Sequence, residues 1–165
     1  MKKTIKPNSF SVFIKTDPNN LDKIQKLIES YKFNLDEAYW LKFKDKNGSF
    51  FKIEFKDISL ENFIDLCNRI KRHADIEGID VVFKGRKDYL LLLQDKGFTK
   101  YEELDYVDFR YKKKNVIIAV MKEDGFYKLK LQIIDTNQEI EVLFLQKLIN
   151  RVFEIIEQRG EQRGD

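Results

Sequence analysis

Residues that commonly serve as nucleophiles, general bases or metal ligands are scarce in this chain, which has one histidine, His73, and one cysteine, Cys67. A single imidazole excludes a metal site built from several histidines. Neither residue stands at a spacing that pairs a nucleophile with a base. His73 follows a basic stretch and is expected at a helix C-terminus. Cys67 lies on an apolar helical stripe and is expected in the core, so we predict no catalytic residue.

The glycines and carboxylates add no specific site. Neither the P-loop pattern nor the Gly-x-Gly-x-x-Gly pattern is present, so no phosphate cradle, cofactor or metal is predicted. The chain has 28 acidic residues, and pairs of carboxylates therefore arise by chance. An enzyme that uses only carboxylates and lysines ranks third among the functions we consider, and a metal-dependent thermal shift would support it.

Lysines alternate with aromatic residues in several segments. Such a pattern on one face of a sheet could stack bases and contact phosphates. The alternative is an ordinary sheet face turned to water. The candidate nucleic-acid face consists of Phe13, Phe50, Lys52, Lys84, Arg86, Lys112 and Lys113.

The elements that would position these residues are clearest in the first half of the chain. Period-two alternation predicts strands over residues 10–15, 39–44, 51–56 and 79–84. Asp17-Pro18 and Ser59 are expected to begin two helices between them. The resulting order, βαββαβ over residues 1–85, is ferredoxin-like, and the fold class is α+β with antiparallel strands and helices on one face.

The second half, residues 86–159, is predicted as a hairpin and a long helix packed on the first half, so that the chain forms one compact unit. Residues 88–97 fit either a short helix, which we favour, or a strand. A strand over 106–111, a hairpin over 116–134 and a helix over 139–158 follow. Residues 160–165 contain no apolar side chain and are expected to form a mobile tail.

Two segments of the chain resemble each other. Residues 48–57 and 125–135 each run from a glycine turn through an alternating strand to an aspartate. Residues 12–15 and 82–84 each precede a predicted helix. Either two hairpin–helix units have converged, or the chain is a tandem βαββα repeat. In a repeat, the halves would share a sheet or face each other across a groove that could hold a ligand.

The last predicted helix has an apolar face wider than one sheet usually covers. Either the helix is enclosed within the fold, or it packs against another protein or a second copy of this chain. The candidate partner surface consists of Phe144, Leu148, Val152 and Ile155.

Overall composition favours an intracellular binding protein. The chain has 165 residues, of which 42% are apolar, and a net charge of +3, low for a nucleic-acid-binding domain. It contains no run long enough to span a membrane, and its start lacks the apolar segment of a signal peptide, so we expect the cytoplasm. We rank first a regulatory protein acting through protein contact, and second an RNA- or single-stranded DNA-binding protein.

Overall fold

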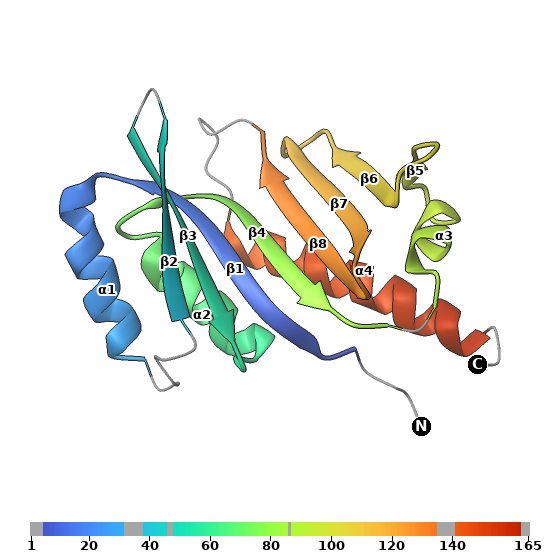
Figure 1. Cartoon of the computed structure of the whole chain (residues 1–165), viewed down its shortest axis with the longest axis horizontal. Coiled ribbons are helices and arrows are strands. Elements are labelled where there is room, and N and C mark those ends of the chain that lie inside the picture. The colour runs from blue at the N-terminus through green and yellow to red at the C-terminus, as the bar shows by residue number, and fades with distance from the viewer. Residues whose placement is uncertain (1–4, 32–37, 46–47, 86, 135–140, 163–165) are drawn as a thin grey trace.

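The computed structural model describes residues 5–31, 38–45, 48–85, 87–134 and 141–162. Within them, eight antiparallel strands form one sheet in the order β2-β3-β1-β4-β8-β7-β6-β5. The helices of the described residues gather on one side of this sheet (Figure 1). The α+β fold class predicted from the sequence is confirmed.

The element bounds are as follows. The strands are β1 (Pro7–Thr16), β2 (Ala38–Asp45), β3 (Gly48–Lys56), β4 (Asp75–Phe83), β5 (Thr99–Lys100), β6 (Tyr106–Tyr111), β7 (Val116–Glu123) and β8 (Phe126–Ile133). The helices are the 3₁₀ turn η1 (Pro18–Asn20), α1 (Leu21–Glu29), α2 (Leu60–Ile70), α3 (Tyr89–Gln94) and α4 (Val142–Gln162).

The first half has the predicted ferredoxin-like arrangement, with strands in the order β2-β3-β1-β4. Its helix starts follow from local chemistry. The Asp17 carboxylate accepts a hydrogen bond from the Asn19 backbone N–H at 3.0 Å, and the Ser59 hydroxyl accepts one from the Asn62 N–H at 3.1 Å. Each cap satisfies an N–H group that a helix start leaves without an internal partner.

The second half contains the predicted hairpin, β7–β8, and the favoured short helix, α3. The Asp88 carboxylate caps α3 by accepting a hydrogen bond from the Leu91 N–H at 3.2 Å. Strand β5 was not predicted, because two residues are too few to show a period. Helix α4 runs from Val142 to Gln162, so residues 160–162, predicted as tail, are helical, whereas residues 163–165 lie outside the described residues.

The two similar segments of the sequence occupy equivalent places in the sheet. Strand β3 pairs with β1, strand β8 pairs with β4, and β1 and β4 pair with each other at the centre. The halves therefore share one sheet, which is one of the two arrangements considered for a tandem repeat.

The core lies between the sheet and the helices. Phe10 of β1 stacks on Phe63 of α2 with ring centroids 4.7 Å apart, and Phe83 of β4 meets Phe153 of α4 edge-on at 5.2 Å. Helix α4 contacts both α2 and α3 as well as packing on the sheet. These neighbours account for its wide apolar face, because the helix is covered from more than one side.

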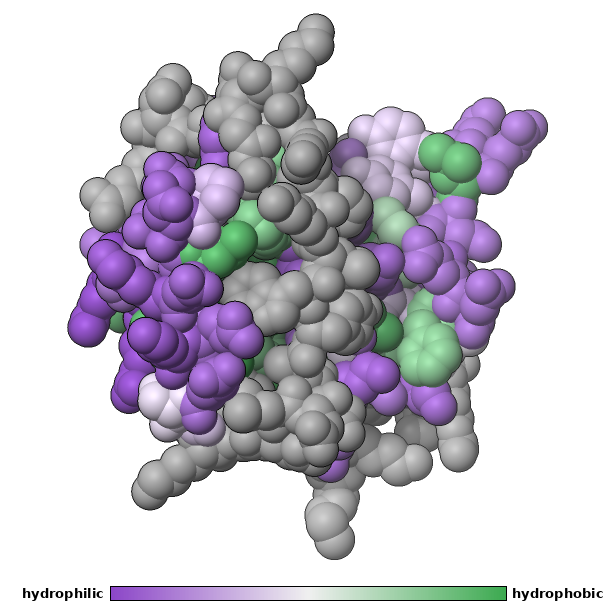
Figure 2. All heavy atoms as spheres, turned by 60° about the vertical axis from the view of Figure 1, so that its left-hand side comes forward, coloured by the Kyte–Doolittle hydropathy of each residue, from purple (hydrophilic) through white to green (hydrophobic). Residues whose placement is uncertain are grey.

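Figure 2 brings the α1 side of the molecule forward. Its coloured residues are mostly hydrophilic, and hydrophobic residues appear there only in small areas. Among the helices of the described residues, none combines the length and the apolar character that crossing a membrane requires.

Candidate functional site

The sheet face opposite the helices carries the sequence's lysine–aromatic pattern. Along β3 and β8, buried residues alternate with half-buried ones, and the half-buried ones point to this open face. No helix of the described residues lies over it (Figure 1). We call this surface, formed by β1, β3, β4 and β8, the open face.

Three lysines on the open face lie over aromatic rings. Lys15 Nζ is 5.6 Å from the centroid of the Phe50 ring, and Lys52 Nζ is 5.7 Å from that of Phe13. On the other half of the sheet, Lys84 Nζ is 5.0 Å from the centroid of Phe126. Each contact is worth about 0.5–1 kcal/mol at an exposed site.

Strand register explains the first two pairs. In the β1–β3 ladder, Lys15 stands directly opposite Phe50, and Phe13 directly opposite Lys52. Side chains directly opposite each other in adjacent strands lie on the same face at about 5 Å between their Cβ atoms. Two lysines and two half-buried rings therefore form one patch at this end of the open face.

The centre of the open face holds a buried carboxylate. Asp80 of β4 is 5% exposed, and within the described part of the chain no hydrogen bond or ion pair reaches its carboxylate. Burial raises the pKa of Asp80, whereas Lys130, Lys128 and Lys52 act in the opposite direction without cancelling the rise. Long side chains of neighbouring strands thus cover an acidic group at the middle of a lysine-rich surface.

The structure brings together part of the predicted nucleic-acid face. Phe13, Phe50 and Lys52 lie side by side, and Lys84 lies on the same face in the other half. Lys112 and Lys113 are exposed in the turn between β6 and β7, separated from β1 by three strands. Arg86 lies outside the described residues.

Several residues of the open face were missed by the sequence analysis. Lys15, Phe126, Lys128 and Lys130 share the alternation that identified Lys52, and Lys15 directly follows the strand core. The similarity between residues 48–57 and 125–135 would have pointed to Phe126 as the counterpart of Phe50. Nothing in the sequence marked Asp80, because its burial depends on side chains from neighbouring strands.

The candidate partner surface on α4 is largely occupied within the fold. Val152 is 2% exposed and Ile155 is 8% exposed, whereas Phe144 and Leu148 are half-buried against the core. Only Leu143, which was not in the predicted set, is a large exposed apolar residue among the described side chains of α4. These four residues therefore do not form a free apolar surface, and the enclosed arrangement is the one found.

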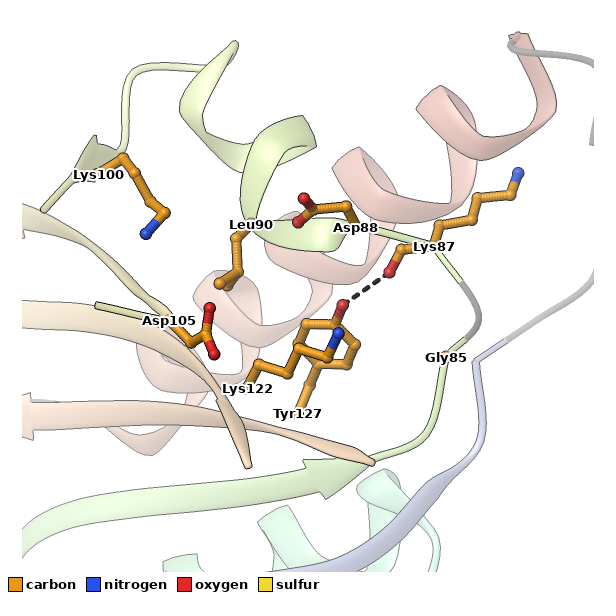
Figure 3. A pocket seen from close by; sticks show the side chains of 8 residues that line it. All are labelled: Gly85, Lys87, Asp88, Leu90, Lys100, Asp105, Lys122 and Tyr127. Carbon is orange, nitrogen blue, oxygen red and sulfur yellow. Dashed lines mark hydrogen bonds between the residues drawn. The ribbon is translucent and has the colours of Figure 1, made fainter. Parts of the chain in front are cut away.

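A pocket of about 190 Å³ opens beside α3, between Lys100, Asp105, Lys122 and Tyr127 (Figure 3). Its polar groups already hold the local fold together. Tyr127 Oη donates a hydrogen bond to the Lys87 carbonyl at 2.7 Å, and Lys100 Nζ donates to the carbonyls of Tyr101 and Leu104. The Lys87 side chain points away from the pocket. Positive and negative groups are mixed here, and the pocket offers no defined ligand geometry.

The single cysteine and the single histidine of the chain lie away from the open face. Cys67 is fully buried on α2, and burial raises the pKa of its thiol. His73 follows the end of α2, where its carbonyl accepts a hydrogen bond from the Thr16 hydroxyl at 2.9 Å. Within the described ranges, histidine, cysteine and carboxylate side chains form no group of three or more that could bind a metal ion.

Comparisons with known proteins assign the chain to no family. No protein-family model matches the chain, and no curated protein matches it. Among solved structures, it is similar to Clostridium acetobutylicum aspartate kinase, described as an important allosteric enzyme for industrial amino acid production, at 10% sequence identity and a TM-score of 0.33. The match covers 92% of this chain and 34% of that one, so the chain spans about a third of that structure's length. A likeness this weak carries no functional argument.

Proposed function

We propose that this protein is a non-catalytic binding protein that holds single-stranded nucleic acid on the open face of its sheet. The observation that carries the proposal is the set of three lysine–aromatic pairs on that one face: Lys15 with Phe50, Lys52 with Phe13, and Lys84 with Phe126. A base that stacks on an aromatic ring gains about 1–3 kcal/mol, and the lysine that it displaces from the face of the ring can reach the adjoining phosphate.

The charge of the open face fits a polyanion. On its strands and at Lys84, the lysines are Lys15, Lys52, Lys56, Lys84, Lys128 and Lys130, whereas the carboxylates are Glu54, Asp75, Asp80 and the β-bulge residue Glu77. Asp17 and Asp57 directly follow β1 and β3, and Lys128 forms an ion pair with Glu123 of β7 at 3.4 Å. The excess of positive charge is therefore confined to the strands themselves and is small. It favours binding of moderate affinity with a clear salt dependence.

Single strands fit this surface better than a duplex. The rings of Phe13, Phe50 and Phe126 are half-buried in the sheet and do not project from it. A base can therefore stack on them only if it leaves its neighbours and approaches the sheet. Bases in a duplex are already stacked and do not present their faces, whereas bases in a single strand do.

Fluorescence anisotropy with labelled single-stranded RNA, single-stranded DNA and duplex DNA tests the proposal. We expect micromolar binding of single strands and weaker binding of the duplex. Three lysine–phosphate contacts predict a loss of about 20-fold in affinity for single strands between about 50 and 200 mM salt. Absence of binding at the lower salt concentration would overturn the proposal.

A matched pair of variants locates the site. The double variant Lys15→Gln/Lys52→Gln should weaken binding at least several-fold. The control Lys23→Gln/Lys147→Gln removes the same charge from exposed positions on α1 and α4 and should change it little. Equal effects would contradict a site on the open face.

Protein contact is the competing function, with an acidic segment of a partner on the same lysines. Titration with a poly-glutamate peptide separates the two. Binding of that peptide, lost in the Lys15→Gln/Lys52→Gln variant while nucleic acids do not bind, would replace the nucleic-acid proposal with an acidic protein partner.

A further inference from the structure

The strand pairing of the open face has an approximate two-fold symmetry, and one type of lysine–aromatic contact follows it. At the β1–β4 junction, Ser11 stands opposite Asp80. On one side of this pair Val12 faces Ile79, and on the other Phe10 faces Val81, so the two strands run outward from it in matched steps. A local two-fold axis through the Ser11–Asp80 pair would exchange β1 with β4.

The β1–β3 and β4–β8 ladders are related by the same two-fold axis. Val12 pairs with Ile53 of β3, and its counterpart Val81 pairs with Leu129 of β8. One step further, Ile14 pairs with Phe51 and its counterpart Phe83 pairs with Tyr127. Burial alternates identically along β3 from Phe50 and along β8 from Phe126.

The lysine–aromatic pairs at the two ends are counterparts under this symmetry. Ile14 and Phe83 occupy matched positions under this symmetry. Lys15 directly follows Ile14 and Lys84 directly follows Phe83, so the two lysines are matched as well. Each lies over the first half-buried phenylalanine of the adjoining strand, at 5.6 Å from the Phe50 centroid and 5.0 Å from the Phe126 centroid. The same interaction therefore occurs at matched positions in the two halves of the sheet, whereas the third pair, Lys52 with Phe13, has no counterpart because Val82 stands at the position that matches Phe13.

We infer that the open face contains two equivalent stacking subsites, Lys15/Phe50 and Lys84/Phe126, and that its ligand is a single strand long enough to occupy both. This inference rests on the proposed function. Stacking on a ring and attraction between an ammonium group and a phosphate do not depend on strand direction. One strand can therefore use two subsites that are related by a two-fold axis.

The distance between the subsites sets the length of that strand. Each pair lies four residues along its strand from the Ser11–Asp80 pair, and three strand spacings separate Phe50 from Phe126. With about 3.3 Å per residue and about 4.8 Å between strands, the subsites are roughly 30 Å apart. At about 3.4 Å per stacked nucleotide, a strand needs about nine nucleotides to span them.

Oligonucleotide length and stoichiometry test the inference. We expect two oligothymidylates of about 4 nucleotides to bind per chain, because each reaches one subsite. An oligothymidylate of about 12 nucleotides should bind one per chain and at least about 10-fold more tightly, because its second contact is intramolecular. Isothermal titration calorimetry measures both quantities.

Phenylalanine-to-leucine variants separate the subsites while keeping an apolar side chain at each position. Phe13→Leu/Phe50→Leu, which removes both rings of the β1–β3 patch, and Phe126→Leu should each reduce the short oligomer from two per chain to one, and should bring the affinity of the long oligomer to that of the short one. The triple variant Phe13→Leu/Phe50→Leu/Phe126→Leu should lose both. Phe109→Leu, at an exposed ring on β6 outside the open face, is the matched control, and thermal unfolding checks that each variant folds.

The outcomes distinguish this inference from the proposed function. One short oligomer per chain, equal affinity for both lengths, and loss of binding in only one leucine variant would leave a single subsite and overturn the inference alone. No binding of either length to the unaltered protein would overturn the proposed function as well.

Discussion

Ser11 and Asp80 face each other across the β1–β4 junction, and both side chains are buried, at 2% and 5% exposed. They are polar, yet they occupy the centre of the sheet face that no described helix covers. This position makes Asp80 the point at which the two halves of the sheet meet and the least solvated carboxylate of the open face.

Replacing Asp80 by Asn should stabilise the protein at neutral pH. Because burial raises the pKa of Asp80 in the folded state, this group favours folding most when protonated, and that contribution is lost as pH rises through the folded pKa. The Asp80→Asn variant should therefore gain on the order of 1 kcal/mol in the free energy of unfolding at pH 7, and the gain should shrink under acidic conditions.

Urea unfolding of both proteins over a pH series measures this difference. The control Asp75→Asn removes an exposed carboxylate from the start of the same strand and should have little effect. A loss of stability in Asp80→Asn at pH 7 would show that attraction to Lys130, Lys128 and Lys52 outweighs the desolvation of the carboxylate.

Truncation of Phe83 should strongly destabilise the fold. Its ring is fully buried and contacts Tyr127 at 5.6 Å and Phe153 at 5.2 Å between centroids. Phe83→Ala leaves a cavity between β4, β8 and α4, so we expect a loss of about 3–5 kcal/mol in chemical denaturation. Phe109→Ala, at a ring that is 37% exposed, should lose much less. Similar losses would mean that the second half packs more loosely than described.

The Cys67 thiol should be unreactive in the native protein. Its side chain is fully buried and its pKa is raised by that burial, so both access and the thiolate fraction are low. At pH 8, an aromatic disulfide reagent should react with no thiol in buffer and with one thiol per chain in denaturant. Rapid reaction of the native protein would instead indicate that α2 opens locally.

Much of the first half could be predicted from local patterns. Alternation located β1, β2, β3 and β4, and Asp17 and Ser59 marked the helix starts that the structure contains. In the second half, the short helix favoured for residues 88–97 is present as α3, which begins after its cap Asp88. These predictions were possible because caps and periodicity depend on residues within a few positions of each other.

The site was only partly predictable. Alternation predicted that Phe13, Phe50 and Lys52 lie on a sheet face of lysines and aromatic residues. Their contacts with each other depend on the β1–β3 register, which alternation does not give. The pairing of Lys84 with Phe126 depends in turn on β8 lying beside β4, and these strands are far apart in the sequence. Lys112 and Lys113 resembled the other basic residues in type, yet the sheet order places them elsewhere.

The sequence by itself determined most of the strands and helices, which sides of them are apolar, and that its two halves resemble each other. Only the tertiary structure decided that β4 joins β8, that α4 is enclosed rather than free, and that Asp80 is buried. The physical reason is that local periodicity specifies the side of an element that must avoid water. Which distant element covers that side depends on how the whole chain packs.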